Sequence, residues 1–408
     1  MKNSYDVVVV GARVAGASTA LLLARAGLDV ALVDRAPYGS DTLSTHGLMR
    51  AGVLQLSRWG VLPELVAAGT PAVERTLFHY GDGDTVRVSI RPTPGVRALY
   101  APRRHLLDRI LVDAAARAGV DVHHGAAVTG LLRSSDDRVA GVRVASRADP
   151  PRDLRAGFTV GADGVRSVVA DQAGADVERR ATSSASVLYR YHADLPVAGY
   201  EWAYGHDGGP VAAGMLPTND GLTCVFVSTT PARLRALRRA GSEAAFEALF
   251  GAAAPEHLPR LRGSTPADRM HGWSGVPGFV RRSWGPGWAL VGDAGYFKDP
   301  ITAHGMTDAL RDAELAANAI IESFAGARAE AVALADYQRQ RDALSRRLFE
   351  TTERIAAYDW DMPGIRRLLR ELSSNMADEV EALERLPVRL ERAVFEENIR
   401  PDRAYARE

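Results

Sequence analysis

The chain of 408 residues has a single cysteine, Cys224, which excludes an intrachain disulfide and a cysteine-rich metal site. It also lacks net charge, because 50 basic residues balance 50 acidic ones, so we expect no nucleic-acid partner. No apolar run reaches the roughly 20 residues that a membrane helix needs, and no basic leader with an apolar core follows Met1. We therefore expect a cytoplasmic protein without a membrane span.

The length and the ordinary globular composition, with 46% hydrophobic and 25% charged residues, predict two to three domains or one domain with large insertions. A strand over Tyr5–Val10, a helix over Ser18–Arg25 and a strand over Asp29–Val33 form a βαβ unit. From about residue 183 to 280 the pattern is that of a second sheet, with one helix over Arg233–Leu249. Further helices are expected over Thr307–Phe324, Leu334–Tyr358 and Arg366–Arg389.

The first motif runs from Gly11 to Gly16, with a strand before it, a helix after it, and Asp34 at the end of the next strand. Glycines at its two ends allow a tight turn and close helix–strand packing, and the helix N-terminus offers N–H groups to a pyrophosphate. Arg13 stands where the motif usually has its middle glycine. Its side chain must either point away or join the phosphate contacts. The alternative is a βαβ turn without a ligand.

Two later segments also follow predicted strands. Asp163 and Gly164 form either a cofactor-binding turn or an ordinary Asp-Gly turn. In the segment from Gly292 to Met306, Asp293 suits a ribityl hydroxyl, and the N–H groups at a helix start suit negative charge on a flavin ring. The alternative is a plain loop between strand and helix. Lys298 lies inside this loop, and we expect it to reach solvent rather than to hold a substrate anion.

These three motifs, in this order, resemble those of the FAD-dependent monooxygenases of the p-hydroxybenzoate hydroxylase type, a superfamily that includes flavin-dependent halogenases and geranylgeranyl reductases. The resemblance covers about residues 5 to 340, and it departs at Tyr296, where the family often has histidine. It implies a cofactor site made of Gly11, Ala12, Arg13, Val14, Ala15, Gly16, Asp34, Arg35, His46, Arg50, Arg104, Val128, Asp163, Gly164, Gly292, Asp293, Pro300, Gly305 and Met306.

The resemblance also implies an α/β fold. A Rossmann-like FAD-binding domain (1–75, 98–182 and 281–340) would carry an inserted mixed-sheet substrate domain (76–97 and 183–280), followed by a C-terminal helical segment (341–408). The implied cofactors are FAD and NAD(P)H. The implied reaction uses O2 to hydroxylate or epoxidise a small aromatic or natural-product-like substrate through a C4a-hydroperoxyflavin. We expect no metal, and a monomer or a homodimer.

No catalytic residue can be assigned from the sequence. Aromatic residues of the middle segment line either a dry substrate pocket or a sheet core; they are Tyr189, Tyr191, Trp202, Tyr204 and Phe226. His192 and His206 have a side chain that titrates near neutrality and could deprotonate a phenol, but a lone histidine is more often structural.

Three other functions stay open. A halogenase agrees with Asp299-Pro300, although the tryptophan–x–tryptophan–x–isoleucine–proline signature of those enzymes is absent. A reductase of isoprenoid double bonds agrees with Tyr200-Glu201-Trp202, although the proline expected after it is missing. A flavin-binding protein without enzymatic activity is the third alternative.

Overall fold

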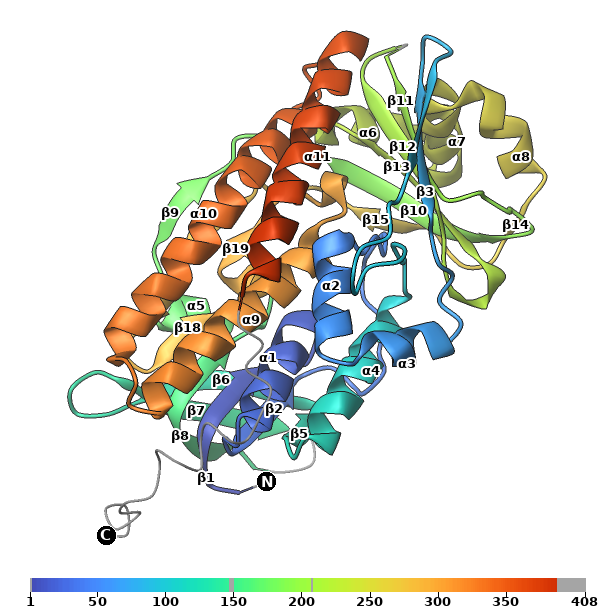
Figure 1. Cartoon of the computed structure of the whole chain (residues 1–408). Coiled ribbons are helices and arrows are strands. Elements are labelled where there is room, and N and C mark those ends of the chain that lie inside the picture. Colours follow the sequence, from blue (N-terminus) through green and yellow to red (C-terminus); the bar gives the residue numbers. More distant parts are fainter. Residues whose placement is uncertain (1, 147–149, 207, 387–408) are drawn as a thin grey trace.

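The computed structural model describes residues 2–146, 150–206 and 208–386. Within these ranges, two large sheets lie at opposite ends of an elongated molecule, and the long helices α9 (Gly305–Phe324), α10 (Glu330–Ala356) and α11 (Met362–Glu384) run along its side (Figure 1). A third sheet of three short strands contains β9 (Val177–Arg180), β16 (Phe279–Arg281) and β19 (Tyr296–Phe297).

The first sheet contains the strands β1 (Ser4–Val10), β2 (Val30–Asp34), β5 (Asp121–His124), β6 (Ala126–Arg133), β7 (Val139–Ser146), β8 (Arg152–Gly161), β17 (Trp284–Gly285) and β18 (Trp288–Leu290). Its order is β17-β18-β8-β1-β2-β5, with β7 attached to β8 and β6 to β7. The five strands β18, β8, β1, β2 and β5 run parallel. Val7, Val8 and Val9 of the central strand are completely buried, as the apolar run of a parallel strand predicts.

The second sheet contains β3 (Arg75–Tyr80), β4 (Thr85–Ser89), β10 (Ser186–Ala193), β11 (Tyr200–Gly205), β12 (Val211–Pro217), β13 (Thr223–Thr229), β14 (Thr265–Pro266) and β15 (His271–Trp273). Its order is β14-β10-β13-β12-β11-β3-β4, and β15 pairs with β10. The pairs are antiparallel except β3 with β11. One face packs on α7 (Ser242–Ala253), and the other packs aromatic residues against α10 and α11.

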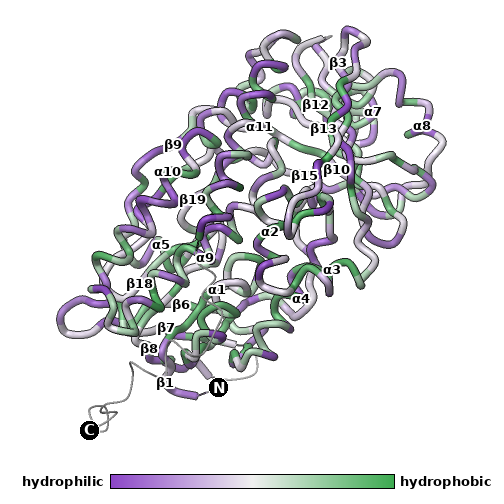
Figure 2. Tube along the Cα trace, viewed as in Figure 1, coloured by the Kyte–Doolittle hydropathy of each residue, from purple (hydrophilic) through white to green (hydrophobic). Residues whose placement is uncertain are grey.

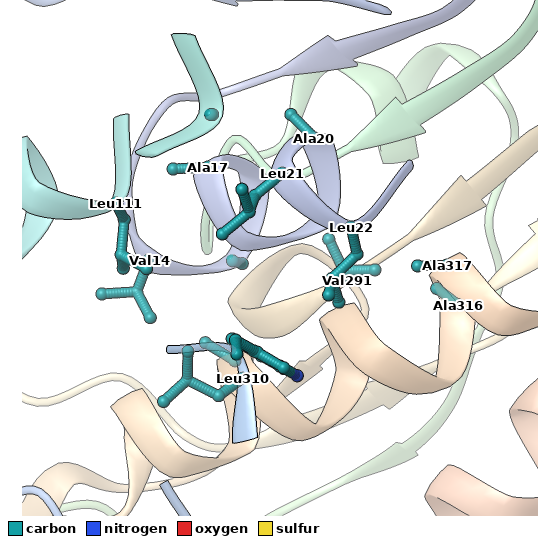
Figure 3. Packing of buried hydrophobic residues seen from close by; sticks show 14 of the residues in the cluster. Val14, Ala17, Ala20, Leu21, Leu22, Leu111, Val291, Leu310, Ala316 and Ala317 are labelled. Carbon is teal, nitrogen blue, oxygen red and sulfur yellow. The ribbon is translucent and has the colours of Figure 1, made fainter. Parts of the chain in front are cut away.

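The remaining helices are α1 (Val14–Arg25), α2 (Arg50–Arg58), α3 (Leu62–Ala67), α4 (Arg104–Arg117), α5 (Val168–Gln172), α6 (Pro231–Leu237) and α8 (Leu258–Arg262). The short 3-10 turns are η1 (Asn219–Gly221), η2 (Arg238–Ala240), η3 (Pro255–His257), η4 (Gly292–Ala294) and η5 (Pro300–Thr302). Helix α1 packs on both α4 and α9, where Leu22, Val291 and Leu310 belong to the largest apolar cluster (Figure 3). Hydrophilic and hydrophobic residues alternate along α10, as expected of a helix with one face on the core (Figure 2).

The α/β fold predicted from the sequence is confirmed. One predicted element is wrong, because the helix expected over Arg233–Leu249 is two helices, α6 and α7. Gly241, with φ of +104°, separates them in a conformation that other residues rarely adopt. The two large sheets draw on different stretches of the chain, but the domain boundaries themselves stay a prediction. The expected end of the last helix at Arg389, and the rest of the segment to residue 408, lie outside the described residues.

Candidate functional site

Three turns meet at one edge of the first sheet, because they follow the neighbouring parallel strands β1, β8 and β18. They touch one another closely. A Cβ atom on Gly11 would lie 2.4 Å from the carbonyl oxygen of Ala162, and one on Gly16 would lie 1.7 Å from the carbonyl oxygen of Gly11. A Cβ on Gly292 would lie 2.9 Å from that of Ala15. The glycines therefore hold together a crevice at the carboxyl ends of the strands, where open α/β sheets bind ligands.

Asp34 lies at the bottom of a depression beside the first turn. Its carboxylate accepts hydrogen bonds from the N–H groups of Ala12 (2.6 Å) and Ala36 (2.7 Å). The depression is shallow and partly open to solvent, and it is lined by Ala12, Arg13, Asp34, Ala36, Pro37, Tyr38, Gly39, Asp108, Arg109, Val112 and His124. A carboxylate fixed in this way suits ribose hydroxyls. Arg35 is exposed next to it, whereas Val14 is buried.

The Arg13 side chain turns toward α4 and the loop at residue 40. Its guanidinium donates to the Asp108 carboxylate (2.9 Å) and to Ser40 Oγ (2.9 Å), and also contacts the Ser40 carbonyl oxygen. Arg104, which begins α4, donates to the same Asp108 carboxylate at 3.1 Å. The Arg13 side chain therefore forms part of the wall of the depression. Arg13 also precedes the first turn of α1, and its side chain does not cap the free N–H groups there.

The second turn uses its own acid internally. The Asp163 carboxylate accepts from Ser167 Oγ and from the N–H of Val168 (2.6 Å), so it fixes the start of α5. Burial raises the pKa of this carboxyl above its ordinary value, although those hydrogen bonds oppose the shift. Gly164 has φ of +80°, and a Cβ there would meet no atom within 4 Å. The open space beside Gly164 is thus the part of this turn that a ligand can approach.

Two further expected residues lie apart from the crevice edge. The Arg50 guanidinium donates to the carbonyl oxygen of Arg91 (2.9 Å) and to Thr93 Oγ1 (2.9 Å). Val128 is a partly buried residue of β6, paired with Val144 of β7. Among the described residues, neither shares a hydrogen bond or a strand pairing with another of the expected site residues.

The third turn presents a free acid. Asp293 is partly exposed, and within the described ranges its carboxylate makes no hydrogen bond. Burial, with the nearby Asp308 charge, raises its pKa to about 6. Beyond η5, which begins at Pro300, helix α9 starts at Gly305 and Met306 without a side-chain cap, and a Cβ on Gly305 would meet no atom. These free N–H groups and the unpaired carboxylate fit the polar edge and the ribityl hydroxyls of a flavin.

A buried network of charged side chains lies beneath this turn. It was not predicted from the sequence. Arg311 is completely buried and contacts the carboxylates of Asp308 (2.8 Å), Asp312 (2.8 Å) and Glu379 (2.9 Å). Asp312 in turn accepts from the N–H of Gly292 at 3.2 Å. The network therefore connects α11 through α9 to the third turn. A completely buried arginine needs partners for its charge, but nothing local in the sequence pairs residues 311 and 379.

The expectation that Lys298 reaches solvent is wrong. Its side chain is 3% exposed, and its ammonium group pairs with Asp308. His304 is buried too and contacts Glu379 at 2.6 Å. Three acids face Arg311 at this place, so the buried ammonium group of Lys298 balances negative charge that the one guanidinium leaves over.

His46 lies between the second sheet and the loop before α9. It is 1% exposed and has φ of +65°. Its Nε2 contacts the hydroxyl of Tyr191, whereas its Nδ1 is buried without a partner. Burial, reinforced by the charges of Arg103 and Arg104, lowers its pKa to about 3, so the ring is neutral. The next residue, Gly47, is so close to Ala303 that a Cβ there would lie 2.9 Å from the Cβ of Ala303.

The tyrosines of β10 form a polar aromatic cluster with residues that the sequence did not indicate. Tyr189 stacks on His271 with ring centroids 4.8 Å apart, and His271 pairs with Asp268 at 2.7 Å. The Arg103 guanidinium lies 3.8 Å from the ring centre of Tyr191. The histidines considered from the sequence lie elsewhere. His192 bonds Ser264 on the α7 side, and His206 is exposed.

A family model described as an FAD binding domain matches residues 4–352. The chain belongs to this FAD-binding family. Among curated relatives, the digeranylgeranylglycerophospholipid reductase of Methanocella arvoryzae is 26% identical over 85% of this chain and 86% of its own length. The menaquinone reductase of Mycolicibacterium smegmatis is 29% identical over 78% of this chain and 76% of its own length.

Solved structures show the same fold at low identity. PqsL of P. aeruginosa, solved with 2-aminobenzoylacetate, has a TM-score of 0.74 at 22% identity and covers 92% of this chain and 100% of its own. The flavin-dependent brominase Bmp2 has a TM-score of 0.75 at 18% identity, with 97% and 98% covered. The resemblance stated from the sequence is thus confirmed, and this member of the FAD-binding family is an FAD-dependent oxidoreductase. Among the described residues, no helix is both long and apolar enough to cross a membrane.

Proposed function

We propose that the chain is an NAD(P)H-dependent monooxygenase that inserts one atom of O2 into a small aromatic substrate bearing an ionisable hydroxyl or amine. The observation that carries the proposal is His46, whose Nδ1 is buried without a partner while its Nε2 contacts Tyr191. A buried imidazole with one free nitrogen has a strong need for a hydrogen-bond partner. The next residue, Gly47, packs against Ala303, two residues before α9 begins, so His46 lies near the candidate flavin site.

When bound, FAD would supply the redox chemistry, in which the two electrons of NAD(P)H reduce O2 so that one oxygen atom enters the substrate and the other leaves as water. The chain's own residues would do three things. The turns at Gly11 and Gly292 would hold the cofactor, and the N-terminus of α9 would stabilise negative charge on its ring. Buried aromatic residues of the second sheet would exclude water. The neutral His46 ring, held by its contact with Tyr191, would accept a hydrogen bond at Nδ1 from the substrate hydroxyl or amine and orient it.

Aromatic hydroxylation can be measured directly. Purified protein with FAD, NADPH, ¹⁸O2 and a panel of phenols and anilines is expected to give products one ¹⁸O atom heavier, at a rate matched by NADPH consumption. Tyr191→Phe should slow product formation roughly tenfold, the effect of losing one hydrogen bond worth about 1.5 kcal/mol that orients His46, while FAD content stays unchanged. Tyr80→Phe, in β3 of the same sheet, is the matched control and should keep full activity.

A product without ¹⁸O, or a Tyr191→Phe variant as active as the parent protein, would contradict this proposal. The second candidate is a reductase that saturates isoprenoid double bonds, and the reductases among the relatives favour it. Tyr200 and Trp202 face the same aromatic cluster as Tyr191, so an isoprenoid chain would bind on that face of the sheet. Chemically reduced protein without oxygen would then add two hydrogen atoms to menaquinone or to a geranylgeranyl lipid.

A further inference from the structure

Three polar side chains meet on the face of the second sheet that is turned away from the aromatic cluster. Along β11, Tyr200, Trp202 and Tyr204 belong to the aromatic cluster, whereas the alternating Ala203 packs toward α7. Glu201 shares this second face, because successive side chains of a strand point to opposite sides. This group is therefore separated by the sheet from the residues discussed above.

Glu201 is accompanied there by His79 of β3 and His257 of η3. The His79 Nε2 atom lies 3.8 Å from Glu201 Oε2, and one ligand atom of each of the three residues lies within 4.8 Å of the others. The side chains come from three elements: two neighbouring strands and the turn before α8. His257 also lies with its ring edge on the ring of His79, at 4.6 Å between centroids.

The decisive feature is that, within the part of the chain that the structure describes, none of the three facing atoms has a partner at hydrogen-bond distance. His79 Nε2, His257 Nε2 and Glu201 Oε2 are buried and unbonded. His79 is 8% exposed and Glu201 is 5% exposed, so water cannot easily serve both groups. Buried polar atoms are normally satisfied, and three that converge on one point indicate a missing partner.

We propose that His79, Glu201 and His257 form a binding site for a zinc-type divalent cation. Two imidazole nitrogens and a carboxylate oxygen are a ligand set that zinc accepts, with a fourth position for water or another side chain. Glu256 is available for that position, because its Oε1 lies 3.5 Å from His257 Nε2. Calcium and magnesium prefer oxygen ligands, so the histidines select against them.

The surroundings hold the ligands in suitable states. His79 Nδ1 pairs with Thr85 Oγ1 at 3.1 Å, which leaves Nε2 for the cation, as a second partner of a ligating histidine does. The ligand atoms must approach to about 3.3 Å of one another, the separation set by metal–nitrogen bonds near 2.0 Å in a tetrahedron.

One positive group lies near the site. The Arg260 guanidinium is 3.7 Å from Glu201 Oε2 and 3.4 Å from His257 Nδ1. Its side chain is 42% exposed, so it can turn toward solvent when a cation takes over the charge of Glu201. The other group of this kind among the described residues, at His304, Asp308 and Glu379, differs because Lys298 and Arg311 already provide its positive charge.

The test is zinc binding by the full-length, FAD-loaded protein. The protein is stripped with a chelator, dialysed against zinc sulfate over a range of free concentrations, and analysed for metal per flavin by mass spectrometry. The parent protein should bind one zinc ion per chain, and excess magnesium should not displace it. Glu201→Gln and His257→Gln should each weaken binding at least roughly tenfold, since even an outer partner of a ligand is worth that much.

His123→Gln is the matched control, because His123 pairs with Asp121 at 2.8 Å in the first sheet, outside the group. It should bind zinc like the parent protein. A parent protein that binds no zinc, or two ligand variants that bind as tightly as the parent, would overturn the proposal. If Glu201→Gln does not fold, His257→Gln decides alone, because that side chain is 15% exposed. Cobalt in place of zinc gives a second reading, since a tetrahedral site produces absorption bands to the red of the flavin that His257→Gln should abolish.

Discussion

Replacement of the buried Arg311 by methionine should destabilise the protein by about 3–5 kcal/mol, the cost of leaving a buried charge without its partner. Methionine fills a similar volume but cannot hydrogen-bond. The guanidinium now contacts three carboxylates, those of Asp308, Asp312 and Glu379, at 2.8 to 2.9 Å. Without it, Lys298 would be the one remaining side chain of fixed positive charge paired within this group.

The assay is urea unfolding, followed by circular dichroism and by flavin fluorescence, because loss of the cofactor and loss of the fold can then be separated. Arg354→Met is the matched control. Arg354 contacts Glu371 at 2.8 Å, but its side chain is 59% exposed, so its removal should cost less than about 1 kcal/mol. Arg311→Met should also weaken FAD retention, because Asp312 would no longer be held against the N–H of Gly292.

The pH dependence of the free energy of unfolding gives an independent check on the effect of Arg311→Met. Burial alone would raise the pKa values of Asp308 and Glu379. Lys298 and Arg311 nevertheless hold the pKa of Asp308 below its ordinary value. His304 and Arg311 do the same for Glu379. Such acids stabilise the fold above their unfolded pKa and lose this effect as the pH falls. Without Arg311 both pKa values rise, so the difference between variant and parent should be largest near neutral pH and shrink toward pH 4. A loss of less than about 1 kcal/mol near neutral pH would refute the reasoning.

Three further predictions concern the turns of the first sheet. Gly16→Ala should reduce both folding yield and FAD content, because its Cβ would lie 1.7 Å from the carbonyl oxygen of Gly11. Gly263→Ala is the control and should be tolerated, because its Cβ would have no neighbour closer than 3.5 Å. Equal flavin-to-protein absorbance ratios in the two variants would contradict this prediction. Burial raises the pKa of Asp293 to about 6, so its contribution to stability falls as the pH rises from about 4 to 6. Asp293→Asn should flatten that fall in a series of thermal midpoints, and parallel curves would count against the assignment. Arg13→Ala should cost about 1–3 kcal/mol of stability, because Asp108 is buried but keeps Arg104 as a partner. FAD affinity measured by fluorescence titration should stay within about tenfold if backbone N–H groups hold the phosphates.

The sequence was most informative where the constraint is local. Gly11 allows the backbone of another turn to approach closely, and Asp34 ends a buried strand. Both were recognisable because the strand that precedes each of them is visible in the neighbouring sequence. The meeting of the three turns also followed, since neighbouring parallel strands end at one edge. The fold class was predictable for the same reason.

Long-range charge pairs were not predictable. Arg311 and Glu379 are 68 residues apart, and neither has a local pattern that indicates burial. Lys298 was misjudged because lysine is usually exposed, and its partner Asp308 could not be recognised as buried. Other misses had a signal. Gly241 is a recognisable helix stop, and the alternating aromatics of Tyr200–Gly205 indicate the strand β11.

The network around Arg311 also bears on how the protein is made. The cofactor site begins at Gly11, near the start of the chain, whereas the charge network beneath its third turn includes Glu379, near the end of the described residues. At about 5–20 residues per second, roughly 20 to 70 s of synthesis separate these two residues. For most of that interval the nascent βαβ unit lacks the strand β18, and until its end it lacks the complete helix α11 that carries Glu379. We therefore expect the chain to bind flavin only after its release from the ribosome. Ribosome-bound chains stalled before residue 379 should then show no flavin absorbance.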